Sequence, residues 1–180
     1  MKSNCTGEGQ NLASAPVNVE VSVTSLFSPT PEHQALREMV RSFSEREVEP
    51  QAHAHDKAEA FNLPLFKKLG DLGLLGITVD EAWGGSGMDA TAAVIVHEEL
   101  SAYDPGFTLA YLAHAVLFAN NLAQNGNDEQ RARFLPDACT GARVGGMCMS
   151  EPGAGTDVLG MSTRAIRDGD HYVLNGAKMW

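Results

Sequence analysis

The sequence predicts an α+β fold in which an N-terminal all-helical bundle domain is followed by the start of a β domain. Three observations carry this prediction. Apolar residues recur at helical spacing in several segments between residues 31 and 140. From Arg143 onward that period disappears, and glycines and short apolar runs replace it. Near the end, Asn175-Gly176 is a strong hairpin signal.

The composition is that of a globular protein with a sizeable core. Of the 180 residues, 43% are hydrophobic and 20% are charged, which fits one domain or one domain plus part of another. The net charge of -10 argues against nucleic-acid binding, because neutralising phosphates requires clustered Lys and Arg. The three cysteines, Cys5, Cys139 and Cys148, have no metal-ligand spacing, so we expect no metal site and no disulfide framework.

The first 28 residues differ from the rest of the chain. They are polar, and Lys2 is the only basic residue before Arg37. A transit peptide is rich in Arg and a secretory signal has an apolar core, and neither pattern is present. We expect a disordered tail over residues 1–28, with an unusual or trimmed targeting segment as the alternative. We expect the remainder to be soluble and intracellular.

Helical signals begin at Thr30. Thr30-Pro31-Glu32 combines a cap residue, a proline and an acid, as helix starts do. An apolar stripe follows at helical spacing; it consists of Leu36, Met39, Val40 and Phe43. We expect this helix to end or kink at Pro50. A second, short helix is expected from about Pro64, with Gly73 at its C-terminal end.

The next elements alternate between loops and helices. We expect the apolar run 74–79 to be extended and residues 83–87 to form a loop. Asp89 is expected to cap a buried helix to about Ala102. Asp104-Pro105 starts a helix that we expect to reach about Gly126, and Asp128 is expected to cap another that ends between residues 136 and 141.

The helix expected over residues 105–126 approaches membrane-spanning length. It carries Tyr111, His114 and two asparagines, and it lacks a basic flank of the positive-inside kind. We therefore expect no membrane span and a central position in a bundle. His114 is expected to be a core histidine with satisfied hydrogen bonds, with a wall of a ligand pocket as the alternative.

Two hairpins are expected after residue 143. Strands at 163–167 and 171–174 flank a turn at residues 168–170, and Asn175-Gly176 should turn the chain into a third strand at 177–180. One hairpin or two cannot form an independent β domain. We therefore expect the natural product to be longer.

The segment from Ser150 to Asp157, at the boundary between the two regions, is the candidate for chemistry. Gly153 and Gly155 allow tight turns and a close ligand approach. Successive N–H groups can form an anion-binding nest, and the hydroxyls of Ser150 and Thr156 can donate or accept. These residues suit a large polar cofactor, although a structural loop between two domains would carry the same signal.

Five segments in chain order resemble motifs of the acyl-CoA dehydrogenase family. The first signature of that family is matched over residues 148–160; the other matches are 83–89, 97–100, 125–141 and 174–180. The likeness covers residues 31–180 and leans toward the isovaleryl-CoA dehydrogenase branch through Met149-Ser150-Glu151 and residues 111–114. It implies an N-terminal helical domain over 29–142 and a partial, truncated middle domain, β-barrel-like, over 143–180.

The resemblance implies an oxidoreductase that acts on CH-CH groups and uses FAD as its cofactor. In the family a carboxylate removes the α proton of an acyl-CoA substrate, and flavin N5 receives the β hydrogen as hydride. An electron-transfer flavoprotein then accepts the electrons. The resemblance further implies fatty acid or branched-chain amino acid catabolism and a homotetramer at full length. The implied compartment is the mitochondrial matrix of a eukaryote or the cytoplasm of a bacterium.

The family pattern assigns FAD to specific positions. Met149 and Ser150 would offer backbone groups to the flavin, and the Ser150 hydroxyl would lie near N5. Gly155 and Thr156 would meet the pyrophosphate, and Thr156, which stands where most members have Ser, would also bind the acyl-CoA. The cofactor-binding residues implied are Met147, Cys148, Met149, Ser150, Gly155, Thr156 and Trp180, whose indole would pack on the flavin.

No catalytic residue is assigned within the chain. The catalytic glutamate of the family lies downstream of Trp180, so the resemblance implies that the 180 residues alone are inactive and bind FAD weakly. Glu151 lies beside the flavin loop, but the resemblance implies that it bonds backbone N–H groups. Two alternatives stay open: a truncated, non-catalytic interaction partner, and a same-fold acyl-CoA oxidase or flavin-dependent monooxygenase.

Overall fold

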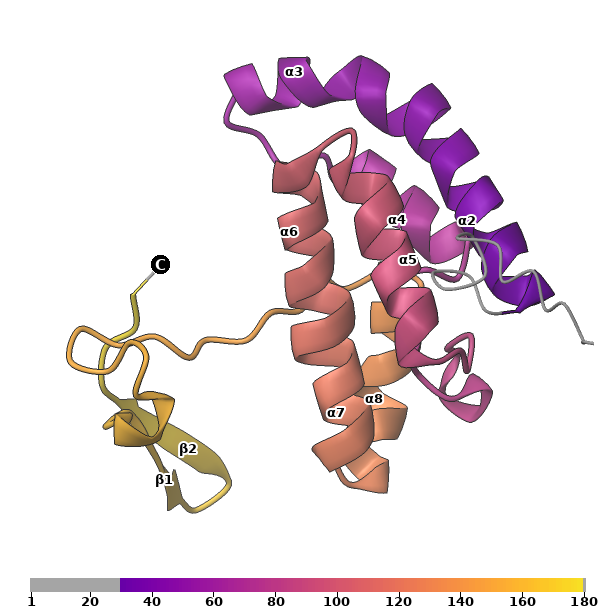
Figure 1. Ribbon diagram of the computed structural model, residues 1–180. Helices are drawn as coiled ribbons and strands as arrows, with labels where there is room; N and C mark the ends of the chain where they lie inside the picture. Colours follow the sequence, from indigo (N-terminus) through magenta and orange to yellow (C-terminus); the bar gives the residue numbers. More distant parts are fainter. Residues whose placement is uncertain (1–29, 180) are drawn as a thin grey trace, which may run out of the picture.

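The computed structural model describes residues 30–179; the tail predicted at 1–28 and the flavin contact predicted for Trp180 lie outside them. Figure 1 shows a bundle of helices, with a two-stranded hairpin standing to one side of it. An extended segment, residues 144–150, joins the two parts. None of the helices within residues 30–179 combines the length and apolar character needed to cross a membrane.

The first helical run does not end at Pro50. Helix α2 (Pro31–Phe43), capped by the Thr30 side chain, passes into a π-helical turn, η1 (Ser44–Val48), and then into α3 (Glu49–Lys57). Pro50 lies in the first turn of α3, where a proline is tolerated. Of the end or kink predicted at Pro50, the end is wrong, and the helical irregularity lies in the wider turn just before the proline.

The apolar run 74–79 was predicted to be extended, and this is wrong. It follows α4 (Leu63–Asp71) and Gly73, whose φ of 73° matches the predicted helix end. The run folds as turns before the short η2 (Glu81–Trp83), and its apolar side chains Leu74, Leu75, Ile77 and Val79 are all buried. Its backbone groups bond within the run, as in the 3.0 Å bond from the Val79 N–H to the Gly76 carbonyl, and with the loop at residues 86–88, as in the 2.9 Å bond from the Met88 N–H to the Ile77 carbonyl.

The later helices follow the predicted order. Asp89 caps α5 (Ala90–Ser101), and Asp104 caps α6 (Pro105–His114). The predicted long helix continues through a π-helical turn, η3 (Ala115–Asn120), and α7 (Asn121–Asn125). The last helix, α8 (Asp128–Cys139), is capped by Asn127 in a capping box with Gln130, not by Asp128 as predicted.

The bundle has two hydrophobic clusters. The larger one joins α2, α4, α5 and α6; its fully buried side chains include Phe66, Leu69, Leu75, Ile95, Leu100 and Tyr111. The smaller one joins Val79, Ala119 and Leu135 with Cys139, and the partly buried Phe118 packs on it. Glu99, buried on α5, binds Arg37 and Arg41 of α2 at 2.6 and 2.9 Å, which ties these two helices together.

The β region contains one hairpin within residues 30–179. Strand β1 (Arg164–Asp168) pairs antiparallel with β2 (His171–Asn175), and every residue of both strands is exposed. The return strand predicted after Asn175-Gly176 is wrong for the described residues 176–179. The Met179 N–H instead donates to the Ser150 carbonyl at 2.9 Å, and the neighbouring Lys178 forms an ion pair with Glu151.

Candidate functional site

The candidate site is the loop from Met147 to Thr156, where the chain leaves the bundle for the hairpin (Figure 1). Two hydrogen bonds fix its approach. The Gly145 N–H donates to His114 Nδ1 at 2.9 Å, and Asn121 Nδ2 donates to Met147 Sδ at 3.3 Å. The segment before the loop is thus held against the end of α6 and the start of α7.

A tight turn forms the middle of the loop. The Glu151 N–H donates to the Ala154 carbonyl at 2.9 Å, and the Ala154 N–H returns a bond of 3.1 Å. Pro152 and Gly153 occupy the two central positions, which turns favour because proline fixes φ and glycine tolerates tight geometry. The chain then enters a 3-10 turn, η4 (Val158–Gly160).

The Glu151 carboxylate holds this turn from inside. Its side chain is only 4% exposed, and it accepts hydrogen bonds from the N–H groups of Thr163 and Ser162 at 3.0 and 2.7 Å and from Lys178 Nζ at 2.9 Å. These bonds, those from Thr163 foremost, hold the pKa of Glu151 well below its ordinary value. An ionised carboxylate with its oxygens so engaged is a poor base, which agrees with the structural role predicted for it.

Lys178 is a site residue that sequence reasoning missed. Its Nζ bonds the Met149 carbonyl at 3.3 Å as well as Glu151, so one ammonium group joins both halves of the loop to the segment after β2. The motif at residues 174–180 contained this lysine. Its partner, however, lies 27 residues away, and nothing in the spacing connects the two.

The outer side of the loop offers hydrogen-bond donors. Within residues 30–179, no protein acceptor bonds the hydroxyls of Ser150 and Thr156 or the N–H groups of Gly155 and Thr156, and all three residues are exposed. A Cβ added at Gly153 or Gly155 would meet nothing within 4 Å, so this side is open. Such a row of free donors suits the phosphate and heteroatoms of a nucleotide cofactor.

The structure therefore brings six of the seven predicted cofactor-binding residues into one loop. Met147 and Met149 are half-buried, whereas Cys148, Ser150, Gly155 and Thr156 are exposed. Beside the loop, Met147 also lines a cavity of about 290 Å³ against η3, α7 and the start of α8.

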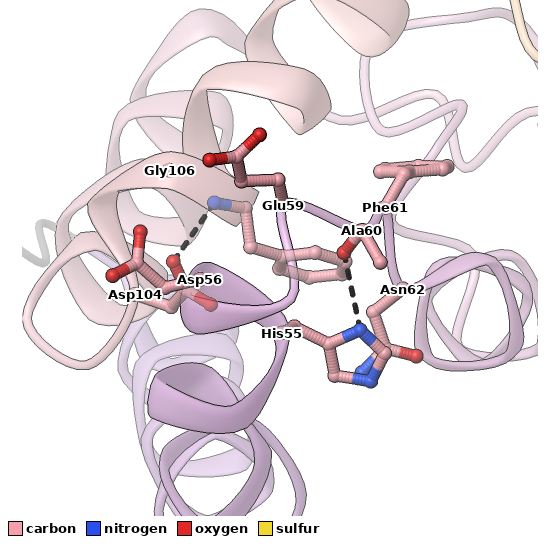
Figure 2. Close-up of a pocket in the computed structure, with 9 residues that line it drawn as sticks. His55, Asp56, Glu59, Ala60, Phe61, Asn62, Asp104 and Gly106 are labelled. Carbon is pink, nitrogen blue, oxygen red and sulfur yellow. Dashed lines mark hydrogen bonds between the residues drawn. The ribbon is translucent and has the colours of Figure 1, made fainter.

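A second cavity, of about 280 Å³, lies at the opposite end of α6 and contains none of the predicted site residues. Figure 2 shows Asp56, Glu59 and Asp104 around it, with His55 turned back to bond the Ala60 carbonyl at 3.1 Å. No group of three or more His, Cys, Asp or Glu side chains in residues 30–179 is placed to hold a metal ion.

Comparisons with known proteins find relatives over most of the chain. Residues 30–142 match the family described as acyl-CoA dehydrogenase, N-terminal domain. The mitochondrial isovaleryl-CoA dehydrogenase of Bos taurus is 43% identical over 151 residues, which are 83% of this chain and 35% of the bovine protein. The chain thus spans about a third of the length of that relative.

Two solved structures are similar in shape. The acyl-CoA dehydrogenase of Bacillus anthracis complexed with FAD superposes with a TM-score of 0.78 at 35% identity, over 84% of this chain and 26% of that one. A chain from the electron transferring flavoprotein structure of Acidaminococcus fermentans gives a TM-score of 0.78 at 34% identity, over 83% of this chain and 39% of that one.

Proposed function

The chain belongs to the acyl-CoA dehydrogenase family, and from that premise we propose that it supplies one side of the FAD site of an enzyme that oxidises acyl-CoA thioesters. The observation that carries this proposal is the loop from Met147 to Thr156. It is held from inside by Glu151 and Lys178, while its free donors lie outside. A rigid loop with exposed donors is what binding a dinucleotide cofactor requires.

Each loop residue has a role in the proposed site. The N–H groups of Gly155 and Thr156 and the Thr156 hydroxyl hold the pyrophosphate, and this hydroxyl also meets the acyl-CoA. The Ser150 hydroxyl donates near flavin N5, and backbone groups of Met149 and Ser150 meet the ring. Met147 and Cys148 line the approach, and Trp180 packs on the flavin. FAD, when bound, supplies the hydride acceptor of the reaction.

The α proton requires a base, and Glu151 does not provide one. Its oxygens are engaged by Thr163, Ser162 and Lys178, and its lowered pKa makes it a weak proton acceptor. Following the family resemblance, we place the base outside residues 1–180. We therefore propose that these 180 residues bind FAD weakly and do not catalyse the reaction alone.

The relatives refine the proposal. The 43% identity with bovine isovaleryl-CoA dehydrogenase supports an isovaleryl-type acyl group as substrate. The likeness to a chain from an electron transferring flavoprotein structure supports a flavoprotein as electron acceptor. We further propose a homotetramer for the whole protein. For a eukaryotic source we propose the mitochondrial compartment of the bovine relative.

Flavin reduction in the purified whole protein tests this function. We expect stoichiometric FAD, loss of the oxidised flavin absorbance on adding isovaleryl-CoA, and reoxidation by an electron-transfer flavoprotein. Reoxidation by oxygen instead would identify an oxidase or monooxygenase. A whole protein without FAD, or FAD that no acyl-CoA reduces, would contradict the proposal.

Two matched threonine variants test the loop itself. Thr156→Val removes a free hydroxyl and one contact with the cofactor, so FAD affinity should fall about tenfold, as the loss of a hydrogen bond to a charged group predicts. Thr140→Val is the control, because its hydroxyl bonds only the local carbonyls of Pro136 and Asp137. Equal FAD affinities in the two variants would remove Thr156 from the site.

A further inference from the structure

His114 is a polar side chain buried in an apolar part of the bundle. It is the last residue of α6 and is 0% exposed. Its ring lies 5.1 Å from that of Phe66 and 6.1 Å from that of Phe118, measured between centroids. Its two nitrogens reach different elements: Nε2 lies 3.0 Å from the carbonyl oxygen of Ala138 on α8, and Nδ1 lies 2.9 Å from the Gly145 nitrogen.

These two contacts determine which nitrogen carries the proton. The Ala138 carbonyl can only accept, so Nε2 must be protonated. The Gly145 N–H can only donate, so Nδ1 must present its lone pair. The neutral ring satisfies both partners. A second proton, on Nδ1, would face the Gly145 N–H and break that bond.

Gly145 fits its place only because it has no side chain. A Cβ built at this position would lie 2.0 Å from the nearest ring carbon of Phe118. The backbone therefore approaches that ring closely while its N–H bonds His114. Two residues later the flavin loop starts at Met147, which Asn121 also contacts. The position of the Gly145 amide thus sets where the loop leaves the bundle.

We propose that neutral His114 is a positioning residue for the flavin loop, which it fixes through the Gly145 amide. The loss of this hydrogen bond leaves the bond from Asn121 to Met147 as the other contact that fixes the segment, so residues 144–146 loosen and Met149 and Ser150 shift relative to the flavin. The positioning of Gly145 by His114 rests only on the 2.9 Å hydrogen bond and the burial of the ring. The effect on FAD rests on the proposed function.

Protonation of His114 would cause the same loss. Burial lowers the pKa of His114 more than its hydrogen bonds to Ala138 and Gly145 raise it. The contribution of this bond to order is therefore complete above the unfolded-state value of about 6.5. It is lost as the pH falls through the lower folded-state value.

Among residues 30–179, no charged group contacts His114 from the elements packed around it. Phe66 and Phe118 present rings, and Ala138 and Gly145 present backbone. The titratable groups nearest to it along the chain of these elements are Tyr111, Cys139, Asp137 and Arg143. Of the others on α4 and α8, Arg131 pairs with Asp128 and the rest are exposed; the exposed ones are Lys67, Lys68, Asp71, Asp128, Glu129 and Arg133. Burial raises the pKa of Tyr111 and of Cys139, so both are neutral, and Arg143 pairs with Asp137 at 2.8 Å.

Two substitutions separate the two bonds of the imidazole. His114→Asn places a carboxamide near the Nδ1 position and can still accept from Gly145. His114→Gln reaches the Nε2 position and can donate to Ala138 but not serve Gly145. In amide hydrogen exchange of the chain, we expect Gly145 to exchange about tenfold faster in the Gln variant and within about twofold of wild type in the Asn variant. Equal exchange in both variants would overturn the proposal.

The pH profile gives a readout that a purely structural role would not change. With the intrinsic exchange rate corrected, protection of Gly145 in the wild type should stay constant above about pH 6.5 and fall as the pH drops below that value, while that in His114→Asn stays constant over both ranges. Amides in α5 serve as the folding control. If His114→Gln does not fold, the comparison of the wild type with His114→Asn still tests the proposal. Protection of Gly145 in the wild type that does not change with pH would overturn it.

FAD titration of the whole protein completes the test. His114→Gln should raise the FAD dissociation constant about tenfold, and His114→Asn should leave it near wild type. Release of Gly145 with unchanged FAD affinity would overturn the positioning role. A wild-type whole protein that binds no FAD would instead contradict the proposed function, and the exchange data would still show whether His114 holds the segment.

Discussion

Replacing Gly145 by alanine should disturb the seating of the flavin loop. The added Cβ would lie 2.0, 2.3 and 2.4 Å from three carbons of the Phe118 ring. Carbon atoms in contact prefer about 3.5–4.0 Å, so either the ring or the segment must move by more than 1 Å, as this comparison estimates. Phe118 packs on the cluster of Val79, Ala119 and Leu135, which limits its retreat. Overpacking of this kind destabilises by about 1–3 kcal/mol.

Urea unfolding followed by circular dichroism measures this loss. With a slope of about 2 kcal/mol per M, a loss of about 2 kcal/mol lowers the unfolding midpoint of Gly145→Ala by roughly 1 M. Gly146→Ala is the matched control, because a Cβ there meets nothing within 4 Å, and it should change stability by less than about 0.5 kcal/mol. Equal midpoints for the two variants would refute the close approach of Gly145 to Phe118.

Three further outcomes follow from the described contacts. Tyr111→Phe removes a buried 3.0 Å bond to a backbone carbonyl and should lower the unfolding free energy by about 1 kcal/mol in the same assay; an unchanged value would contradict the bond. Lys178→Met should weaken FAD binding by the whole protein and Lys178→Arg less so, as flavin fluorescence would report; equal affinity in wild type and Lys178→Met would exclude its role in the loop. Burial raises the pKa of Glu99, but the hydrogen bonds from its two arginine partners outweigh burial, so the net pKa lies below its ordinary value. The contribution of Glu99 to stability is therefore complete above about pH 4.5 and is lost as the pH falls through the folded-state pKa. The unfolding free energy of Glu99→Gln should therefore depend less on pH below about pH 4.5 than that of the wild type. An equal dependence in the two proteins would contradict this.

Helix starts were predictable because capping is local. Thr30, Asp89 and Asp104 were each expected to cap a helix, and each accepts a hydrogen bond from the N–H three residues later. At the last helix the cap is Asn127, one residue earlier than expected, because only Asn127 places Gln130 where the reciprocal bond of a capping box can form.

The errors share a non-local cause. An apolar run such as 74–79 does not distinguish a strand from buried turns, because only the surrounding helices decide how it is covered. Asn175-Gly176 carries a hairpin signal, yet the chain after it follows the ion pair of Lys178 with Glu151. At Pro50 a π-helical turn accommodates the proline, and single-residue propensity does not foresee that turn.

In the candidate site, too, local features were predictable from the sequence and long-range contacts were not. The motif at residues 148–160 predicted the loop, because its residue types and order are visible in the sequence. The contacts that hold the loop were not visible, because they join positions far apart in the chain. Lys178 meets Glu151 across 27 residues, and His114 meets Gly145 across 31.

A crystal structure of the whole protein with bound FAD would decide the loop assignment. We predict pyrophosphate oxygens within hydrogen-bond distance of the N–H groups of Gly155 and Thr156, and the flavin ring beside Ser150. FAD bound elsewhere, with the donors of residues 150–156 facing only solvent, would contradict it.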